Sequence, residues 1–175
     1  MIAALVQGPV GRLVPVAIVL LALQTTLFVD VQPFGVVLQV LTAFAAAAGV
    51  AGGPERGVLA GFLLGLVYDL GTGAPLASSS LTMGLAGLAA GSVSYLNIQV
   101  HWWLAAAFVA VGTAVGELAV PVVRYIIGQN DVFTTRLYVI VPVVSVAAGV
   151  LSPVFVPLSR WCLRVGKVEW KVPEA

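Results

Sequence analysis

Apolar residues fill six long stretches of the chain, and short polar or Gly/Pro-containing segments separate them. A helix needs about 20 apolar residues to cross the ~30 Å hydrocarbon core of a bilayer, with about 17 as a practical minimum. The pattern therefore predicts six membrane-spanning helices, at about residues 13–29, 34–52, 54–70, 76–96, 102–127 and 137–158. Because the connecting segments are short, we predict an all-α membrane protein: one six-helix bundle over residues 1–175, ending in a basic tail, 159–175.

The composition agrees with lipid as the main surroundings of the chain. Hydrophobic residues make up 61% and charged residues 9% of the sequence, whereas a soluble domain carries about 25% charged residues. The net charge of +1 gives no indication of nucleic-acid binding. The first stretch follows Arg12 as in a signal peptide, but no small-x-small cleavage site comes after it, so we interpret it as an uncleaved span.

The positions of lysine and arginine predict the orientation of the bundle, because positively charged loops stay on the cytoplasmic side. The side of the six-span arrangement that holds at most Arg124 and Arg136 is predicted to be the outer side. The opposite side holds six cations, Arg12, Arg56, Arg160, Arg164, Lys167 and Lys171. Both termini are therefore expected in the cytoplasm.

Glycines recur at helical spacing in three of the predicted spans. Gly57, Gly61 and Gly65 are four residues apart and so share one face of the third helix. Glycine lets a neighbouring helix approach closely, and small-xxx-small patterns are common at helix contacts in membranes. The fourth and fifth spans carry further glycines, Gly84, Gly87, Gly91, Gly112 and Gly116. Internal packing of the bundle is one interpretation, and a docking face for another membrane protein is the other.

Asp69 lies near the end of the third span. A carboxylate costs roughly 2.5–3.5 kcal/mol at mid-bilayer on insertion scales, and a position near a helix end lowers that cost. The turn 71–73 follows Asp69, and Ser78, Ser79 and Ser80 open the next helix. We predict that Asp69 is a structural clamp that accepts hydrogen bonds from the turn amides or from these serines. A contact with a partner or ligand is the alternative.

Glu117 is placed deeper in the membrane, within the fifth span. Arg124 follows seven residues later on the same helix face, with Pro121 between them. A proton relay needs several titratable groups in sequence, and no histidine or lysine lies within any predicted span. We therefore interpret Glu117 as a buried charge satisfied by Arg124, by Gln24 or Gln39, or by a partner helix.

The basic tail has a regular spacing of cations. Arg160, Arg164, Lys167 and Lys171 follow one another at intervals of 4, 3 and 4, which aligns them on one helix face. Such a segment would lie on the cytoplasmic surface, where each cation contributes about 1 kcal/mol against anionic lipid. The simpler interpretation is a positive-inside signal that ends the last span.

The sequence lacks the motifs of catalytic and metal sites. It has one histidine, His101, and one cysteine, Cys162, so neither a disulfide within the chain nor a His/Cys metal cluster is predicted. It contains no GxSxG, Walker or HExxH motif and no paired carboxylates on one helix. We predict no catalytic residues, no cofactor and no metal.

Residues 61–70 have the sequence GFLLGLVYDL, and 71–76 continue with GTGAPL. This run resembles the signature of the MreD family, a Gly-Phe-x-x-Gly-x-x-x-Asp-Leu pattern followed by a small, Ser/Gly-rich turn. Ala77 stands where that family usually has a glycine. The chain length, six predicted spans, Gln24 late in the first span and a proline-rich last span are looser similarities. About 20 residues carry the specific part of the resemblance.

The resemblance implies a non-catalytic scaffold in the bacterial cytoplasmic membrane, within the elongation machinery that sets rod shape and positions peptidoglycan synthesis. Members of the family work with the membrane-anchored protein MreC, and through it with MreB filaments and with RodA and its penicillin-binding partner. The fold implied is similar to that of the substrate-binding subunits of energy-coupling-factor transporters. The Ala- and Gly-rich composition points to a high-GC source such as an actinobacterium.

Two other classes of protein are alternatives. A substrate-binding subunit of an energy-coupling-factor vitamin transporter has a similar helical frame and often an Ala-x-x-x-Ala docking motif in its first span. Here Ala17 and Ala22 are five residues apart, and the outer side offers few polar groups for a vitamin beyond Gln32, Asn130 and Asp131. A membrane-embedded enzyme, such as a lipid phosphatase or acyltransferase, would need a catalytic constellation that the sequence does not contain.

Overall fold

The computed structural model of the chain describes residues 9–26, 35–96, 101–128 and 137–165. These residues form α2 (Pro9–Thr26), α3 (Val40–Gly52), α4 (Pro54–Thr72), α5 (Ser78–Gly91), the short 3-10 helix η2 (Ser92–Leu96), α6 (Trp102–Ile126) and α7 (Leu137–Leu163). No strand occurs within the described ranges. The predicted all-α class is confirmed for this part of the chain.

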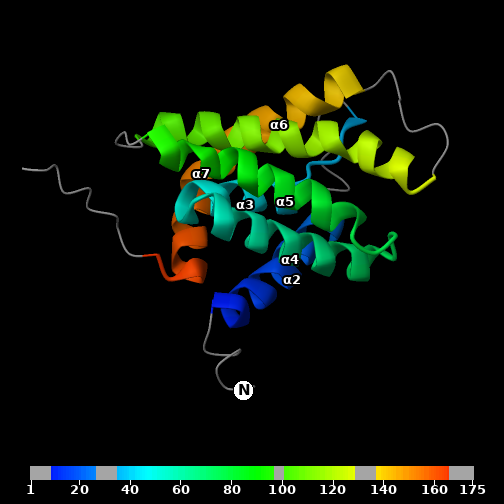
Figure 1. The fold of residues 1–175 in the computed structure, drawn as a ribbon, viewed down its shortest axis with the longest axis horizontal. Coiled ribbons are helices and arrows are strands. Elements are labelled where there is room, and N and C mark those ends of the chain that lie inside the picture. Colours follow the sequence, from blue (N-terminus) through cyan, green and yellow to red (C-terminus); the bar gives the residue numbers. More distant parts are fainter. Residues whose placement is uncertain (1–8, 27–34, 97–100, 129–136, 166–175) are drawn as a thin grey trace, which may run out of the picture.

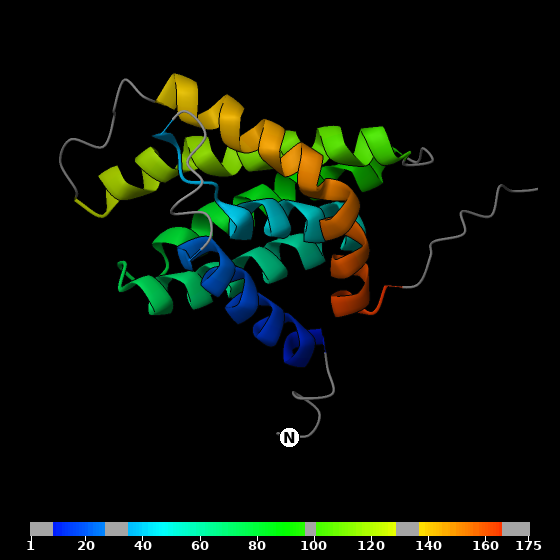
Figure 2. The same cartoon turned by 180° about the vertical axis from the view of Figure 1, so that it is seen from behind.

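The helix α3 forms the centre of the bundle (Figures 1 and 2). It packs against α2, α4, α5, α6 and α7. Its residues 40–49 are all buried, and alanine dominates among them. The small side chains let five helices surround α3 closely, and the larger Phe44 packs edge-to-face on Phe155 of α7 with ring centroids 5.7 Å apart. The core is therefore arranged around a single short helix.

The outer helices α6 and α7 are the two described helices that are long and apolar enough to cross a membrane. Their 25 and 27 residues correspond to about 37 and 40 Å at 1.5 Å per residue. Both helices expose large apolar side chains, among them Val111, Leu118, Val122, Val146, Val150 and Val154. A surface of this kind matches contact with hydrocarbon.

The helices differ from the predicted spans mainly at their ends. The second span was expected from Phe34, but α3 begins at Val40, and residues 36–39 are not helical. With 13 residues, α3 is only about 20 Å long, less than the ~30 Å hydrocarbon core. In the fourth span, α5 ends at Gly91 and η2 continues to Leu96. The remaining helices follow the predicted segments within a few residues, although residues 27–29 lie outside the described ranges.

The last helix continues beyond its predicted end at residue 158, to Leu163, and it changes direction on the way. Figures 1 and 2 show its C-terminal part turning away from the line of its first part. Pro153 and Pro157 lie inside this helix, and a proline ring both removes a helix hydrogen bond and pushes on the preceding turn. The turn brings Trp161 to α2, where the Arg12 guanidinium lies 4.8 Å from the centre of the indole ring.

One end of the bundle collects most of the described cations. Arg12 also donates a hydrogen bond to the Trp161 carbonyl at 3.3 Å, and Gly52 at the end of α3 lies against Leu163. The starts of α2 and α4 and the ends of α3 and α7 therefore meet at this end. We call it the basic end; it carries Arg12, Arg56, Arg160 and Arg164.

Candidate functional site

Asp69 lies at the opposite end of the bundle, where α4 meets the start of α5. Its side chain is 1% exposed. The Ser79 backbone N–H donates to both carboxylate oxygens, with nitrogen–oxygen distances of 3.2 Å, and the Ser78 hydroxyl lies 3.4 Å from Oδ1. A carboxylate at a helix N-terminus satisfies amides that lack a partner within the helix and interacts favourably with the helix dipole. Asp69 thus caps α5 from the neighbouring helix.

Ala77 immediately precedes α5 and has a left-handed backbone, with φ 74° and ψ −5°. Residues with a Cβ atom adopt this conformation at a cost, whereas glycine adopts it freely. In the family signature that residues 61–76 resemble, a glycine usually stands at this position. The cap from Asp69 and the strain at Ala77 therefore occur at adjacent points of the same turn.

The glycines of α4 face α5. A Cβ atom added at Gly57 would lie 2.5 Å from the Gly87 carbonyl oxygen, and one at Gly61 or Gly65 would overlap the backbone of Met83 or Ser80. We call this contact, formed by Gly57, Gly61, Gly65 and Gly87, the glycine seam. Because α5 occupies this face of α4, the structure leaves no room there for a helix of another protein.

Other glycines join further helices to this pair. A Cβ atom at Gly91 would lie 2.6 Å from the Cα of Pro54, and one at Gly112 of α6 would lie 2.6 Å from the Cβ of Ala90. Gly84 differs, since its nearest neighbour would be the Val58 carbonyl at 3.6 Å, an ordinary contact distance. Most of the small-residue pattern is therefore used inside the bundle.

Glu117 is buried in α6, with 3% of its side chain exposed. Gln39 Nε2 donates to Glu117 Oε2 at 3.1 Å, and Gln39 Oε1 accepts from the Thr42 hydroxyl at 3.0 Å. Glu117 Oε1 is buried and has no hydrogen-bond partner in the described part of the chain. Of the partners considered from the sequence, Gln39 is the one that forms a hydrogen bond with Glu117 among the described residues, whereas Arg124 forms no close ion pair with it.

Gln24 has a role that the sequence did not reveal. It is 4% exposed, and its Oε1 accepts a hydrogen bond from the Leu41 backbone N–H at 3.2 Å. Leu41 is the second residue of α3, so Gln24 caps α3 from α2 in the way that Asp69 caps α5 from α4. Gln24 was one of the alternative partners considered for Glu117, and among the described residues the hydrogen bond to Glu117 comes from Gln39 instead.

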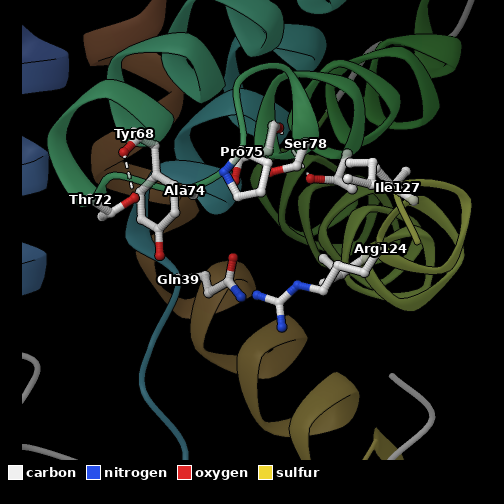
Figure 3. Close-up of a pocket in the computed structure, with 12 residues that line it drawn as sticks. Gln39, Tyr68, Thr72, Ala74, Pro75, Ser78, Arg124 and Ile127 are labelled. Atoms are coloured by element: carbon white, nitrogen blue, oxygen red, sulfur yellow. Dashed lines mark hydrogen bonds between the residues drawn. The ribbon is translucent and has the colours of Figure 1, made fainter. Parts of the chain in front are cut away.

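A pocket of about 340 Å³ opens beside these polar residues, between the ends of α4 and α6 and the starts of α3 and α5. Its lining includes seven polar side chains, Gln39, Tyr68, Thr72, Ser78, Ser79, Thr82 and Arg124. Figure 3 shows the Tyr68 hydroxyl and the Arg124 guanidinium on either side of the Gln39 amide. The sequence predicts few polar groups on this side beyond Gln32, Asn130 and Asp131, and these three residues lie outside the described ranges.

The basic tail is only partly within the described residues. Arg160 belongs to α7, and Arg164 follows the helix with a left-handed backbone, φ 52°. The change of backbone at Arg164 ends the helical alignment of these two cations. Lys167 and Lys171 lie outside the described ranges, so the predicted surface helix of the tail stays a prediction.

The described residues offer a polar pocket and no group suited to a metal ion. They contain no group of three or more His, Cys, Asp and Glu side chains that could hold a metal ion. Ser78 and Ser79 lie beside Asp69, but their contacts with it serve the helix cap. The pocket combines one cation, hydroxyls and an amide, a set suited to recognising a polar or anionic group.

Comparison of the chain with protein-family models, with curated proteins and with solved structures finds no match.

Proposed function

We propose that the chain is a non-catalytic membrane scaffold of the bacterial elongation complex, similar in role to members of the MreD family. The supporting observation is the use of the resembling segment, residues 61–76. Gly61 and Gly65 join α4 to α5, and Asp69 caps α5. In this segment the glycines and the carboxylate hold two helices together. Residues with that use are expected in the signature of a non-catalytic scaffold, because they build the fold and carry out no reaction.

The same proposal includes a place in the cytoplasmic membrane. Six spans with both termini in the cytoplasm put the basic end on the inner side and the pocket on the outer side. The position of Arg12, Arg56, Arg160 and Arg164 at one end supports this orientation. Exposed Trp102, Trp103 and Trp161 are typical of helix ends at a membrane interface.

The proposed partner is an MreC-type membrane protein, and through it MreB filaments and the synthase formed by RodA and a penicillin-binding protein. Since α5 fills the glycine face of α4, the partner's helix would contact the exposed apolar surface of α6 or α7 instead. The basic tail would contact anionic lipid at the cytoplasmic face.

The pocket favours a second candidate function, the substrate-binding subunit of an energy-coupling-factor vitamin transporter. Ligand sites commonly have volumes of about 300–1,000 Å³ and a few convergent polar groups. The pocket, at about 340 Å³, has a suitable size and carries Arg124, Tyr68 and Gln39. In this alternative the outer position of the pocket would serve vitamin capture.

Crosslinking and detergent co-purification of the tagged chain from its native membrane separate the two candidates. The scaffold proposal expects recovery of an MreC-type protein or a cell-wall synthase, identified by mass spectrometry. Recovery of an ATPase with a transducing subunit, or of a tightly bound vitamin, would overturn it in favour of the transporter. The variant Gly61→Val is the negative control. Its bundle should not form, so partners that bind the folded protein specifically should be lost, whereas nonspecific partners should remain.

A further inference from the structure

Two donor groups in the pocket have no acceptor among the described residues. The hydroxyls of Thr72, Ser78 and Thr82 donate to the Tyr68 carbonyl, to Asp69 and to the Ser79 carbonyl. No hydrogen bond or ion pair joins the Arg124 guanidinium or the Tyr68 hydroxyl to another described residue. These two groups, from α6 and α4, flank the same space in Figure 3.

From this arrangement we propose that the pocket binds a phosphate group, with the Arg124 guanidinium and the Tyr68 hydroxyl as its donors. Guanidinium binds phosphate through paired, charge-assisted hydrogen bonds, and a phenol supplies a further donor in a fixed direction. The only described cation outside the basic end is Arg124. It is exposed, so an anion can reach it without unfolding the bundle.

The neighbouring carboxylates do not face a ligand in this pocket. Asp69 is 1% exposed, and both of its oxygens accept from the Ser79 amide. Glu117 lies behind Gln39, whose side chain lines the pocket and donates to Glu117 Oε2. A ligand therefore meets the Gln39 amide and the Arg124 guanidinium, and its phosphate is not placed against a bare carboxylate.

The depth of the pocket favours a lipid as the source of the phosphate. Arg124 lies two residues before the end of α6, a helix long enough to cross the bilayer, so it falls at the level of lipid headgroups. Val122 and Ile126 next to it are 50% and 75% exposed. Acyl chains can follow this apolar surface while the pocket, at about 340 Å³, holds the headgroup.

The test uses the full chain, purified in an uncharged maltoside detergent and depleted of lipid. Retention of phosphatidylglycerol and of diacylglycerol with the same acyl chains is measured by native mass spectrometry. A second arm follows the thermal midpoint with inorganic phosphate. The variants are Arg124→Gln and Tyr68→Phe, and Arg56→Gln is the matched control because it removes an exposed arginine at the basic end.

We expect the wild-type protein to retain phosphatidylglycerol in preference to diacylglycerol. Loss of a charged donor should weaken this retention about tenfold in Arg124→Gln, and Tyr68→Phe should weaken it less. Arg56→Gln should behave as wild type. A thermal shift with inorganic phosphate that requires Arg124, without lipid retention, would also support a phosphate site but assign it to a soluble ligand.

Equal retention of the two lipids without a thermal shift from inorganic phosphate, or equal behaviour of Arg124→Gln and Arg56→Gln with both phosphate probes, would overturn the proposal. So would loss of a co-purified protein partner in Arg124→Gln when neither phosphate probe binds, because the pocket would then accept an acidic side chain of that partner. The phosphate site does not depend on the scaffold function, so the two can fail separately.

Discussion

The glycine seam and the pocket beside it differ in packing and in hydrogen bonding. In the seam, backbone meets backbone, and both oxygens of the adjacent Asp69 accept hydrogen bonds. In the pocket, about 340 Å³ is open, and the Arg124 guanidinium and the Tyr68 hydroxyl form no hydrogen bond with another described residue. The difference separates two kinds of residue: those whose substitution should change folding, and those whose substitution should change only what the protein binds.

The strongest way to break the seam is Gly61→Ala. The added methyl group would overlap the Met83 carbonyl, which belongs to the backbone of α5 and cannot turn aside. We expect the free energy of unfolding to fall by about 3 kcal/mol, the upper part of the usual range for overpacking. Unfolding in mixed detergent micelles, followed by circular dichroism, measures the change.

Gly84→Ala is the matched control for that substitution. Gly84 also lies in this pair of helices, but a Cβ atom there would meet nothing closer than 3.6 Å. Alanine restricts the unfolded chain and favours helix, so stability should stay unchanged or rise by up to about 1 kcal/mol. Equal losses in the two variants would contradict the tight seam.

The cap on α5 should contribute less than the seam. In Asp69→Ala the Ser79 amide loses its acceptor, and we expect a loss of about 2 kcal/mol in the free energy of unfolding. Asp69→Asn keeps one acceptor oxygen and should lose less. Glu55→Ala, at an exposed position in the first turn of α4, is the comparison. A loss in Glu55→Ala as large as in Asp69→Ala would contradict the cap.

Removing the backbone strain at Ala77, beside the cap, should raise the free energy of unfolding, and by less than the loss expected for Asp69→Ala. Ala77→Gly relieves a left-handed alanine, and after the added flexibility of the unfolded chain is subtracted we expect a gain of about 0.5–1 kcal/mol. Ala74 in the same turn does not have a positive φ. Ala74→Gly should therefore give no gain, and a gain as large as that of Ala77→Gly would argue against backbone strain as the cause.

The smallest effect on folding is expected on the pocket side of the comparison. Arg124 is exposed and makes no described hydrogen bond, so Arg124→Gln should change the stability of the ligand-free protein by less than about 0.5 kcal/mol. The same unfolding measurement in lipid-depleted detergent tests this. A loss comparable with that of Asp69→Ala would show that Arg124 belongs to the framework.

Much of the framework was predictable from the sequence because it depends on local patterns. Spacing alone placed Gly57, Gly61 and Gly65 on one face, and the short turn after Asp69 put its carboxylate within reach of Ser78 and Ser79. The start of α3 was not predictable by the same means. Residues 36–38 are as apolar as the helix that follows, and hydropathy does not distinguish an apolar helix from an apolar non-helical segment.

The pocket was missed because its residues meet only through tertiary packing. Gln39, Tyr68, Ser78 and Arg124 are spread over nearly half of the chain, and nothing in their local sequence relates them. The seven-residue spacing predicts that Glu117 and Arg124 share one face of α6. In the structure the bundle covers Glu117, whereas Arg124 lies near the helix end, where less of the bundle covers it.

The enclosure of α3 has a consequence for how the chain is made. Synthesis delivers α3 early, yet four of the five helices that enclose it, α4, α5, α6 and α7, emerge later. Until α7 is inserted, the alanine-rich surface of α3 is not fully covered, and Phe44 lacks its contact with Phe155. Biogenesis should therefore finish at the C-terminal helix, and a nascent chain halted before α7 should remain a substrate for membrane chaperones and quality-control proteases.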